Sequence, residues 1–463
     1  MTTDEELVNR VLLPGFTGTT LPDWLARATD AGLAGVCLFG SNVDAGFAGL
    51  VADLHDRRAG FLVASDEEGG PVSRLDTFGL TAWPAATALG RLDDLAVTEA
   101  VGAGIGAQCR GIGIDLALAP VVDVNSEPEN PVIGVRSFGA TSDLVARHGA
   151  AFVRGLQGAG TAGAAKHFPG HGSTTLDSHK ALPRVVDDVA TLRARDLPPF
   201  AAAIEAGVRC VLTAHVLFPA LDDRPATMSP PLLRLLREEL GFDGVVISDA
   251  VDMDAIAATV GMGPGAVAAV AAGVDLVCIG NPWNGYHDET GYLQVHDALL
   301  AALADGTLPR ERVADAGRRV AELAAWVRAA PPAPAAANGL GERVVRRVVE
   351  VAGNVRIGPG AHVLDLTGQV NVAAGCAAAP RFVAALRRDD PAVTAGEDVP
   401  ADRPLVLVVR GPSPALDAAR AARPDAVAVH VGWPGSWAPP APSITLYGDG
   451  RVHAEVAAEL LTG

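Results

Sequence analysis

The chain has 463 residues, of which 49% are hydrophobic and 5% aromatic, and it carries a formal net charge of −18 at pH 7. This length exceeds that of one typical domain, and the apolar content excludes an intrinsically disordered chain. The negative charge argues against nucleic acid or an anionic membrane surface as the main partner, because both are themselves negatively charged.

The N-terminal stretch MTTDEELVNR carries acidic residues where a secretory signal has basic ones. Elsewhere, no run approaches the ~18 apolar residues of a membrane span. We therefore expect a cytoplasmic protein without a membrane partner. The five cysteines, several of them in apolar runs, are expected to be reduced and buried; they are Cys37, Cys109, Cys210, Cys278 and Cys376.

Eight short apolar runs predict strands that are buried on both faces: 11–16, 34–40, 60–65, 114–120, 162–166, 209–215, 244–248 and 274–280. Helical patterns lie between several of these runs, at 93–113, 141–160, 189–207 and 228–241. In the last pattern we expect Ser229 to be the N-cap and Gly241 to follow the helix. This alternation predicts an α/β fold, a (β/α)₈ TIM-like barrel of parallel strands.

Charged or titratable side chains lie at or just beyond the ends of five of the eight runs: Asp66, Asp123, Lys166 with His167, His215, and Asp249. Because barrels carry their active sites at the carboxyl ends of the strands, these residues are candidates for a site. Simpler interpretations stay open. Asp66 and Asp249 could each cap a following helix, and His215 could be a core or supporting histidine.

The stretch KHFPGHGSTTLDSHK (166–180) leaves the fifth predicted strand, and its Gly and Pro content predicts a loop. Asp177 and His179 lie two residues apart in it, so the carboxylate can accept the Nδ1 proton of the imidazole. That contact would fix the tautomer and favour the charged form, which makes His179 a candidate proton carrier. Alternatives are a structural loop, or a metal site built from His167, His171, His179 and His215. The loop lacks the helical spacing typical of zinc-binding histidine pairs, so we predict no metal.

Two arginines extend the candidate site. In DEEGGPVSR (66–74), Gly69 and Gly70 could turn the chain sharply and return Arg74 to the mouth of the barrel. NPVIGVRSFG (130–139) carries Arg136 on a predicted loop, and a solvated arginine is the alternative interpretation there.

The remaining chain predicts a second unit. Two helical patterns close the barrel, and the Pro/Ala-rich stretch 330–341 has the composition of a semi-rigid linker. We therefore divide the chain into a catalytic barrel (1–329), a linker (330–341) and a C-terminal α/β domain (342–463). The C-terminal domain has a predicted helix over about 342–352, four strand-like runs and a final helix, and it lacks a cluster of His, Asp or Glu. We expect it to be a supporting domain.

Five segments, in this order and spacing, resemble the third family of glycoside hydrolases: DEEGGPVSR, NPVIGVRSFG, KHFPGHGSTTLDSHK, LTAHVLFPALD and VVISDAVDM. They are most similar to bacterial β-N-acetylglucosaminidases of peptidoglycan turnover, including two-domain members. The resemblance implies that Asp249 is the catalytic nucleophile and that His179 is the general acid/base, oriented by Asp177. It also implies which residues bind the terminal N-acetylglucosamine: Asp66, Arg74, Arg136, Lys166 and His167.

The chain departs from many relatives directly after the implied nucleophile, where Ala250 and Val251 replace a second acid and a Leu. This change leaves the reacting carboxylate in place but alters the charge around it. We predict no cofactor.

Retaining glycoside hydrolysis needs a nucleophile on one side of the scissile bond and a proton donor on the other, and an imidazolium is a competent donor near neutral pH. We therefore expect an exo-acting, retaining β-N-acetylglucosaminidase that acts on peptidoglycan-derived fragments through a glycosyl ester on Asp249. Two alternatives stay open. The same site could catalyse phosphorolysis, because the dyad repels phosphate less than a carboxylate would. In a different class, the protein could bind or sense carbohydrate without turnover. The sequence does not indicate the oligomeric state.

Overall fold

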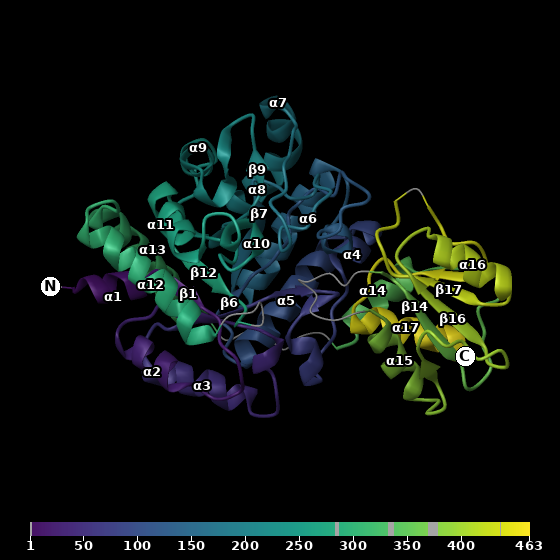
Figure 1. Cartoon of the computed structure of the whole chain (residues 1–463). Helices are drawn as coiled ribbons and strands as arrows, with labels where there is room; N and C mark the ends of the chain where they lie inside the picture. Colours follow the sequence, from purple (N-terminus) through teal and green to yellow (C-terminus); the bar gives the residue numbers. More distant parts are fainter. Residues whose placement is uncertain (1, 283–286, 332–337, 369–377, 436) are drawn as a thin grey trace.

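A computed structural model describes residues 2–282, 287–331, 338–368, 378–435 and 437–463 of the chain (Figure 1). Within these ranges, eight parallel strands form the first unit: β1 (Leu12–Pro14), β2 (Gly35–Leu38), β3 (Leu62–Ser65), β6 (Leu116–Ala117), β7 (Ala162–Phe168), β8 (Cys210–Thr213), β11 (Val245–Ile247) and β12 (Val277–Gly280). Each lies in one of the predicted apolar runs, although β7 continues to Phe168, two residues beyond the predicted end.

The strands curl into a barrel. Six of them pair in the order β11-β8-β7-β6-β3-β2, and β1 pairs in parallel with β12. A parallel bridge between Ile247 and Leu276 links β11 to the start of β12, and β1 packs beside β2. The predicted α/β fold with a TIM-like barrel is therefore confirmed.

The helices of the barrel lie between and around these strands. Two of them, α5 (Leu95–Gly111) and α6 (Ser142–Gly158), lie close to their predicted ranges and pack against each other. The pattern at 228–241 forms α9 (Pro230–Arg234) and a π-helical turn (Leu235–Glu239). Ser229 caps α9 as expected, because its side chain accepts a hydrogen bond from the Leu232 N–H, and Gly241 follows with φ +68°.

Other elements of the barrel are α1 (Asp4–Asn9), α2 (Asp23–Asp30), α3 (Phe47–Arg57), α4 (Ala86–Leu92), α7 (Val189–Thr191), a π-helical turn (Leu192–Asp196), α8 (Leu197–Glu205), α10 (Asp254–Ala257), α11 (Met262–Ala272), α12 (Asp288–Ala304) and α13 (Arg310–Ala329). Two hairpins project from strand ends, β4 (Glu67–Gly69) with β5 (Val72–Ser73) and β9 (Leu217–Phe218) with β10 (Asp222–Pro225).

One end of the barrel is closed by the apolar face of helix α13. Val320, Leu323 and Val327 of α13 pack into the same buried cluster as the inward side chains of the strands. The Arg319 side chain of this helix reaches the carbonyl of Asp243, which precedes β11, so α13 lies at the amino ends of the strands. The polar residues that follow the strands therefore gather at the opposite, open end.

The second unit is built on its own sheet (Figure 1). In the described part of the chain this sheet has the order β13-β18-β17-β16-β14-β15, and only the β13–β18 pair is antiparallel. Its strands are β13 (Glu350–Ala352), β14 (His362–Leu366), β15 (Thr394–Ala395), β16 (Leu405–Val409), β17 (Val427–His430) and β18 (Ser443–Thr445). Its helices are α14 (Leu340–Val348), α15 (Ala378–Arg387), α16 (Pro414–Ala422) and α17 (Arg451–Thr462).

The four predicted strands of this unit are confirmed, whereas the helix predicted over about 342–352 is too long. It ends at Val348, and 350–352 forms β13 instead. The reason is tertiary pairing, since Val351 lies opposite Ile444 on β18 and ladder hydrogen bonds replace helical ones.

The two units contact each other along the segment that follows β3. Arg451 at the start of α17 pairs with Asp76 at 2.9 Å, and Arg381 of α15 donates to the carbonyl of Pro71 at 3.1 Å. Helix α14 packs against α4. The division into barrel, linker and C-terminal domain remains our prediction, and residues 332–337 of that linker lie outside the described residues.

Cys37, Cys109, Cys210 and Cys278 are free and buried, as expected, and Cys376 lies outside the described residues. Among the helices that the structure describes, none is both long and apolar enough to cross a membrane.

Candidate active site

The open end of the barrel contains a cavity of about 100 Å³. Its lining includes seven of the eight predicted site residues: Asp66, Arg74, Arg136, Lys166, His167, His179 and Asp249. The eighth, Asp177, contacts His179 at the edge of this cavity. Segments that are far apart in the sequence are therefore brought to one place.

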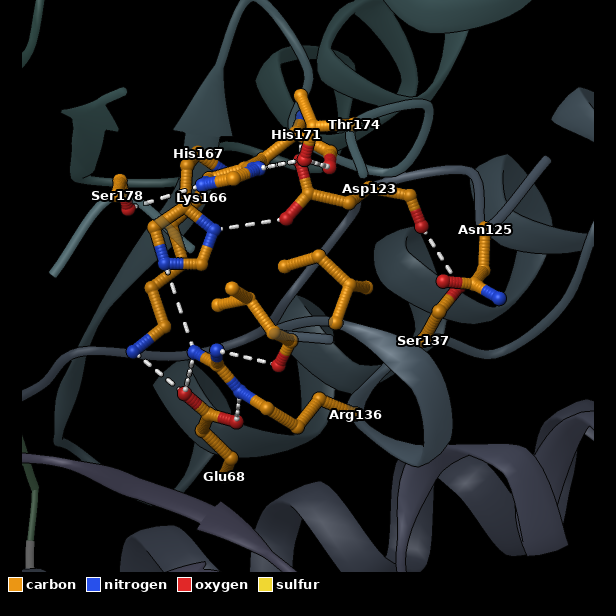
Figure 2. A network of polar contacts seen from close by, with 12 residues as sticks. Glu68, Asp123, Asn125, Arg136, Ser137, Lys166, His167, His171, Thr174 and Ser178 are labelled. Carbon is orange, nitrogen blue, oxygen red and sulfur yellow. Dashed lines mark hydrogen bonds and ion pairs between the residues drawn. The ribbon is translucent and has the colours of Figure 1, made fainter. Parts of the chain in front are cut away.

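A buried network of alternating charges forms one wall (Figure 2). The Nζ atom of Lys166 lies 2.9 Å from Asp66 Oδ1 and 2.6 Å from Glu68 Oε1. Arg136 binds Glu68 through two hydrogen bonds of 2.9 and 2.8 Å, and Arg74 reaches Asp66 at 3.1 Å. The solvated interpretation of Arg136 is therefore wrong, because the residue is only 4% exposed and is held by a carboxylate.

These charges keep one another ionised. Burial raises the pKa of Asp66, but the positive charges of Lys166 and Arg74 outweigh burial and hold that pKa well below its usual range. Burial likewise lowers the pKa of Lys166, and the carboxylates of Asp66 and Glu68 outweigh it, so the pKa is raised. A buried ion pair persists when its partners satisfy each other in this way. The wall thus offers fixed donors and acceptors to a polar ligand.

His167 is held by a carboxylate beneath it. Its Nδ1 atom lies 2.7 Å from Asp123 Oδ2, and Asp123 Oδ1 accepts hydrogen bonds from the backbone N–H groups of His167 and His171 (Figure 2). Because Nδ1 donates to Asp123, Nε2 is the acceptor and faces Arg136 Nη2 at 3.5 Å. Asp123 is completely buried and so acts through His167 rather than by touching a ligand.

The loop after β7 is ordered by His171. Its Nδ1 and Nε2 atoms lie 2.7 Å from Thr174 Oγ1 and 3.0 Å from Ser178 Oγ (Figure 2). Its carbonyl accepts a hydrogen bond from Asn130. Burial lowers the pKa of His171 to about 4, so the imidazole is neutral near pH 7 and bridges two hydroxyls. Ser178 immediately precedes His179, and this bridge therefore holds the backbone beside His179 in place.

The predicted contact between Asp177 and His179 is present. His179 Nδ1 lies 2.8 Å from Asp177 Oδ1, and the His179 backbone N–H donates to the same oxygen at 2.9 Å. Burial raises the pKa of Asp177, but the hydrogen bond and charge of His179 outweigh it, and the pKa is lowered. The carboxylate is thus ionised, and the Nε2 atom of the imidazole is left for another partner.

Asp249 follows β11 and lines the same cavity as His179. It is not a helix cap, because the next helix, α10, begins at Asp254 with Met253 before it. Burial raises the pKa of Asp249, and the imidazoles of His215, His167 and His179 outweigh burial and lower it. The ionised carboxylate of Asp249 and the imidazole of His179 therefore line the same cavity.

The helix-cap alternative is also wrong for Asp66, which is followed by the hairpin strand β4 rather than by a helix. His215 is completely buried, and its Nε2 lies 2.9 Å from the carbonyl of Ala250. It therefore supports the backbone beside Asp249, in line with the simpler interpretation. Within the described ranges, no three or more His, Cys, Asp or Glu side chains are grouped so that they could hold a metal ion.

Sequence reasoning missed Glu68. It lies between a lysine and an arginine in the buried network, yet in DEEGG it is one of three consecutive acids. The pairing with Arg136, 68 positions away, is a property of the folded barrel. The cavity is also lined by Asp252 and Asn281, which the sequence had not indicated.

The chain is similar to known proteins in sequence and in structure. Residues 19–323 match the model of the glycosyl hydrolase family 3 N-terminal domain. A beta-hexosaminidase of Stenotrophomonas maltophilia (strain K279a) is 39% identical over 322 residues, which is 64% of this chain and 92% of that protein. Beta-hexosaminidase A of Pseudoalteromonas piscicida is 37% identical over 279 residues, and this match spans about half of that protein, 46% of its length.

A solved structure is similar over both units. The glycoside hydrolase family 3 beta-N-acetylglucosaminidase from Paenibacillus sp. str. FPU-7 superimposes with a TM-score of 0.81 at 30% sequence identity. The superposition covers 100% of this chain and 97% of that one.

Proposed function

The chain belongs to glycosyl hydrolase family 3, and from this premise we propose that it is an exo-acting, retaining β-N-acetylglucosaminidase. One observation carries the proposal: the carboxylate of Asp249 and the imidazole of His179, backed by Asp177, line the same cavity at the open end of the barrel. A retaining mechanism needs a nucleophile and a proton donor in this relation.

In the first step, the Asp249 carboxylate attacks the anomeric carbon, and the bond to the leaving-group oxygen breaks. The Nε2–H of the His179 imidazolium protonates that oxygen, while Asp177 holds Nδ1 and stabilises the charged ring. The products of this step are a neutral glycosyl ester on Asp249 and a neutral imidazole. Both charges of a buried site disappear together, which limits the electrostatic cost of forming the intermediate.

In the second step, the neutral His179 accepts a proton from a water molecule, whose oxygen attacks the anomeric carbon. The ester bond breaks, Asp249 returns to its carboxylate form, and the sugar leaves with its original anomeric configuration. The same imidazole thus acts first as an acid and then as a base.

The charged wall supports recognition of a single terminal sugar. Asp66 and Arg74 can bind hydroxyl groups in fixed positions because their own partners hold them. The apolar side chains of Leu118 and Leu212 line the same cavity, and its volume of about 100 Å³ is the reason that we expect only the end of a glycan to enter it. The choice of N-acetylglucosamine follows the names of the relatives, and the family resemblance favours peptidoglycan-derived fragments as the source.

A steady-state comparison tests this proposal. The purified protein is given an aryl β-N-acetylglucosaminide and the matching aryl β-glucoside, each with and without phosphate, and the sugar products are identified. We expect a strong preference for the N-acetylglucosaminide and release of free sugar whether or not phosphate is present. A sugar 1-phosphate that forms only with phosphate would establish a phosphorylase instead, and absence of turnover with both glycosides would favour a binding protein.

A further inference from the structure

The hairpin of β4 and β5 carries three charged side chains of the active-site wall. Asp66 precedes the hairpin, Glu68 lies in β4, and Arg74 directly follows β5. The carboxylate of Glu67 ties the end of the hairpin to its start, because Oε1 accepts the backbone N–H of Arg74 at 2.9 Å. We call residues 66–76 the wall hairpin. An isolated hairpin of this length is at best marginally stable, so its position depends on what packs against it.

The second unit approaches the turn of the wall hairpin at backbone distance. The turn is made by Gly69 and Gly70, which have φ angles of +83° and +59°. A Cβ atom at Gly450, the residue before α17, would lie 2.4 Å from the carbonyl oxygen of Gly70, which is closer than real Cβ atoms come. The backbones of the two units therefore meet at this point, and a side chain at position 450 would push the turn away.

Arg381 holds the turn from the second unit. This residue of α15 donates from Nη2 to the carbonyl of Pro71 at 3.1 Å and from Nη1 to the carbonyl of Asp449 at 3.0 Å. One guanidinium group thus links the turn of the wall hairpin to the loop that precedes α17.

Arg451 holds the other end of the wall hairpin. Its Nε atom donates to Asp76 Oδ1 at 2.9 Å, and its Nη2 atom donates to the carbonyl of Leu80. The Asp76 side chain is only 9% exposed, so this ion pair is sheltered from water and is expected to be stronger than an exposed pair. Because Arg74 comes three residues after Pro71 and two before Asp76, the two points that the second unit holds flank it on both sides.

The position of Arg74 matters because its side chain lines the cavity and reaches Asp66 at 3.1 Å. Hydrogen bonds weaken steeply when distance or angle changes, so a small shift of this backbone would spoil the contacts that the guanidinium group makes to a sugar. Arg381 and Arg451 are not among the residues that line the cavity. Any effect of these two arginines on the sugar must therefore pass through the wall hairpin.

We propose that Arg381 and Arg451 are positioning residues for the terminal sugar, which hold the wall hairpin at Pro71 and Asp76 and thereby set the place of Arg74 in the cavity. This inference rests on the proposed glycosidase function. It gives the second unit a part in binding the terminal sugar without contact between these two arginines and the substrate.

A double-mutant cycle tests whether Arg451 acts through Arg74. For Arg451→Ala, we expect kcat/KM for a nitrophenyl β-N-acetylglucosaminide to fall about fivefold or more, and the inhibition constant of N-acetylglucosamine to rise by a similar factor. Arg451→Lys keeps the charge beside Asp76 and should recover part of the loss. In an Arg74→Ala background, adding Arg451→Ala should change both values less than about twofold, because the side chain that it positions is gone.

Arg388→Ala is the matched control. Arg388 pairs with Glu455, the acid that Arg451 also contacts, but within the described part of the chain it has no hydrogen bond or ion pair to the wall hairpin. This variant should keep kcat/KM within about twofold. If Arg451→Ala costs as much in the Arg74→Ala background as in the unmodified protein, or no more than Arg388→Ala, the positioning role is overturned.

Hydrogen exchange tests the hold on the wall hairpin without any turnover. In Arg381→Ala and in Arg451→Ala, amides of residues 66–76 should exchange about tenfold faster or more, whereas those of β12 should keep the rate of the unmodified protein. Unchanged exchange in the wall hairpin, or faster exchange throughout the chain, would overturn the proposal. If the unmodified protein hydrolyses no glycoside, the proposed function fails, and this failure is distinct because the exchange of the wall hairpin is measured independently.

Discussion

The Nδ1 atom of His179 lies 2.8 Å from the Oδ1 atom of Asp177, and the backbone N–H of His179 donates to the same oxygen. One carboxylate oxygen therefore holds both the ring and the main chain of the neighbouring histidine. The ring has one orientation, and its Nε2 atom is available to a substrate.

The first prediction concerns the proton that His179 delivers. In His179→Ala, we expect turnover of a saccharide glycoside to fall by at least about 10³-fold, because its leaving oxygen is strongly basic and needs protonation. Glycosides with an acidic phenol as leaving group should lose much less in the first step. The measurement is kcat/KM for a series of aryl and alkyl β-N-acetylglucosaminides, and similar losses across the series would count against the acid role.

The second prediction concerns Asp177. Asp177→Asn keeps the size of the side chain but removes the charge that stabilises the imidazolium, so kcat/KM for a saccharide substrate should fall by about 10- to 100-fold. Asp187→Asn is a suitable control, because Asp187 is another partly exposed acid with a basic partner, Arg195. A loss in Asp177→Asn no larger than in this control would remove Asp177 from the mechanism.

The third prediction concerns Glu68, which pairs with Lys166 and Arg136 in the buried wall. Glu68→Gln leaves two buried cations without their shared carboxylate and should lower the free energy of unfolding by about 3 kcal/mol or more. Glu99→Gln removes one partner of the exposed pair with Arg154 and should cost less than about 1 kcal/mol. Chemical denaturation of both variants measures the two values, and equal values would contradict a stabilising role for the network.

The fourth prediction concerns pH and His171, whose pKa burial lowers to about 4. An unfolded histidine has a pKa of about 6.5, so between these two values the unfolded chain binds more protons than the folded one. This group therefore stabilises the fold less as pH falls from about 6.5 toward 4. In His171→Gln the side chain at position 171 no longer titrates, and the bridge between Thr174 and Ser178 is lost. All other titratable groups remain, so their contribution to the pH dependence is the same in both proteins.

Unfolding of the wild type and of His171→Gln at pH 7 and pH 5 measures this effect. At pH 7 the wild type should be the more stable protein, and at pH 5 its advantage should be smaller by about 2 kcal/mol. If the difference in the free energy of unfolding between the two proteins is the same at both pH values, His171 is not a neutral, buried imidazole in the folded protein.

Much of this architecture could be predicted from the sequence because its signals are local. The run Val245–Ile247 is apolar at every position and Asp249 follows it after Ser248, and this pattern predicts a carboxylate at the mouth of a barrel. The dyad could be predicted for the same reason, since Asp177 and His179 are only two residues apart. The contact expected from this short spacing is present in the folded protein, and the fold places His179 at the cavity.

What could not be predicted depends on pairing between distant segments. Nothing in DEEGG distinguishes Glu68 from its neighbours until Arg136 is folded against it. The strand β13 follows a helix without a break in composition, and only its pairing with β18 ends the helical pattern. A groove between the barrel and the second unit is lined by residues of the two units that are at least 186 positions apart in sequence, so no motif marks it.

The proposed mechanism requires that Asp249 is the residue that becomes esterified. In His179→Ala, a β-N-acetylglucosaminide with a strongly acidic phenol can transfer its sugar without acid assistance, but the water that releases it lacks a base, so the ester should accumulate. Rapid acid quenching, intact mass and peptide mapping of this variant then identify the labelled residue. We predict one added N-acetylglucosaminyl residue, carried by Asp249. A label on another residue, or turnover to the inverted anomer without any adduct, would contradict the mechanism.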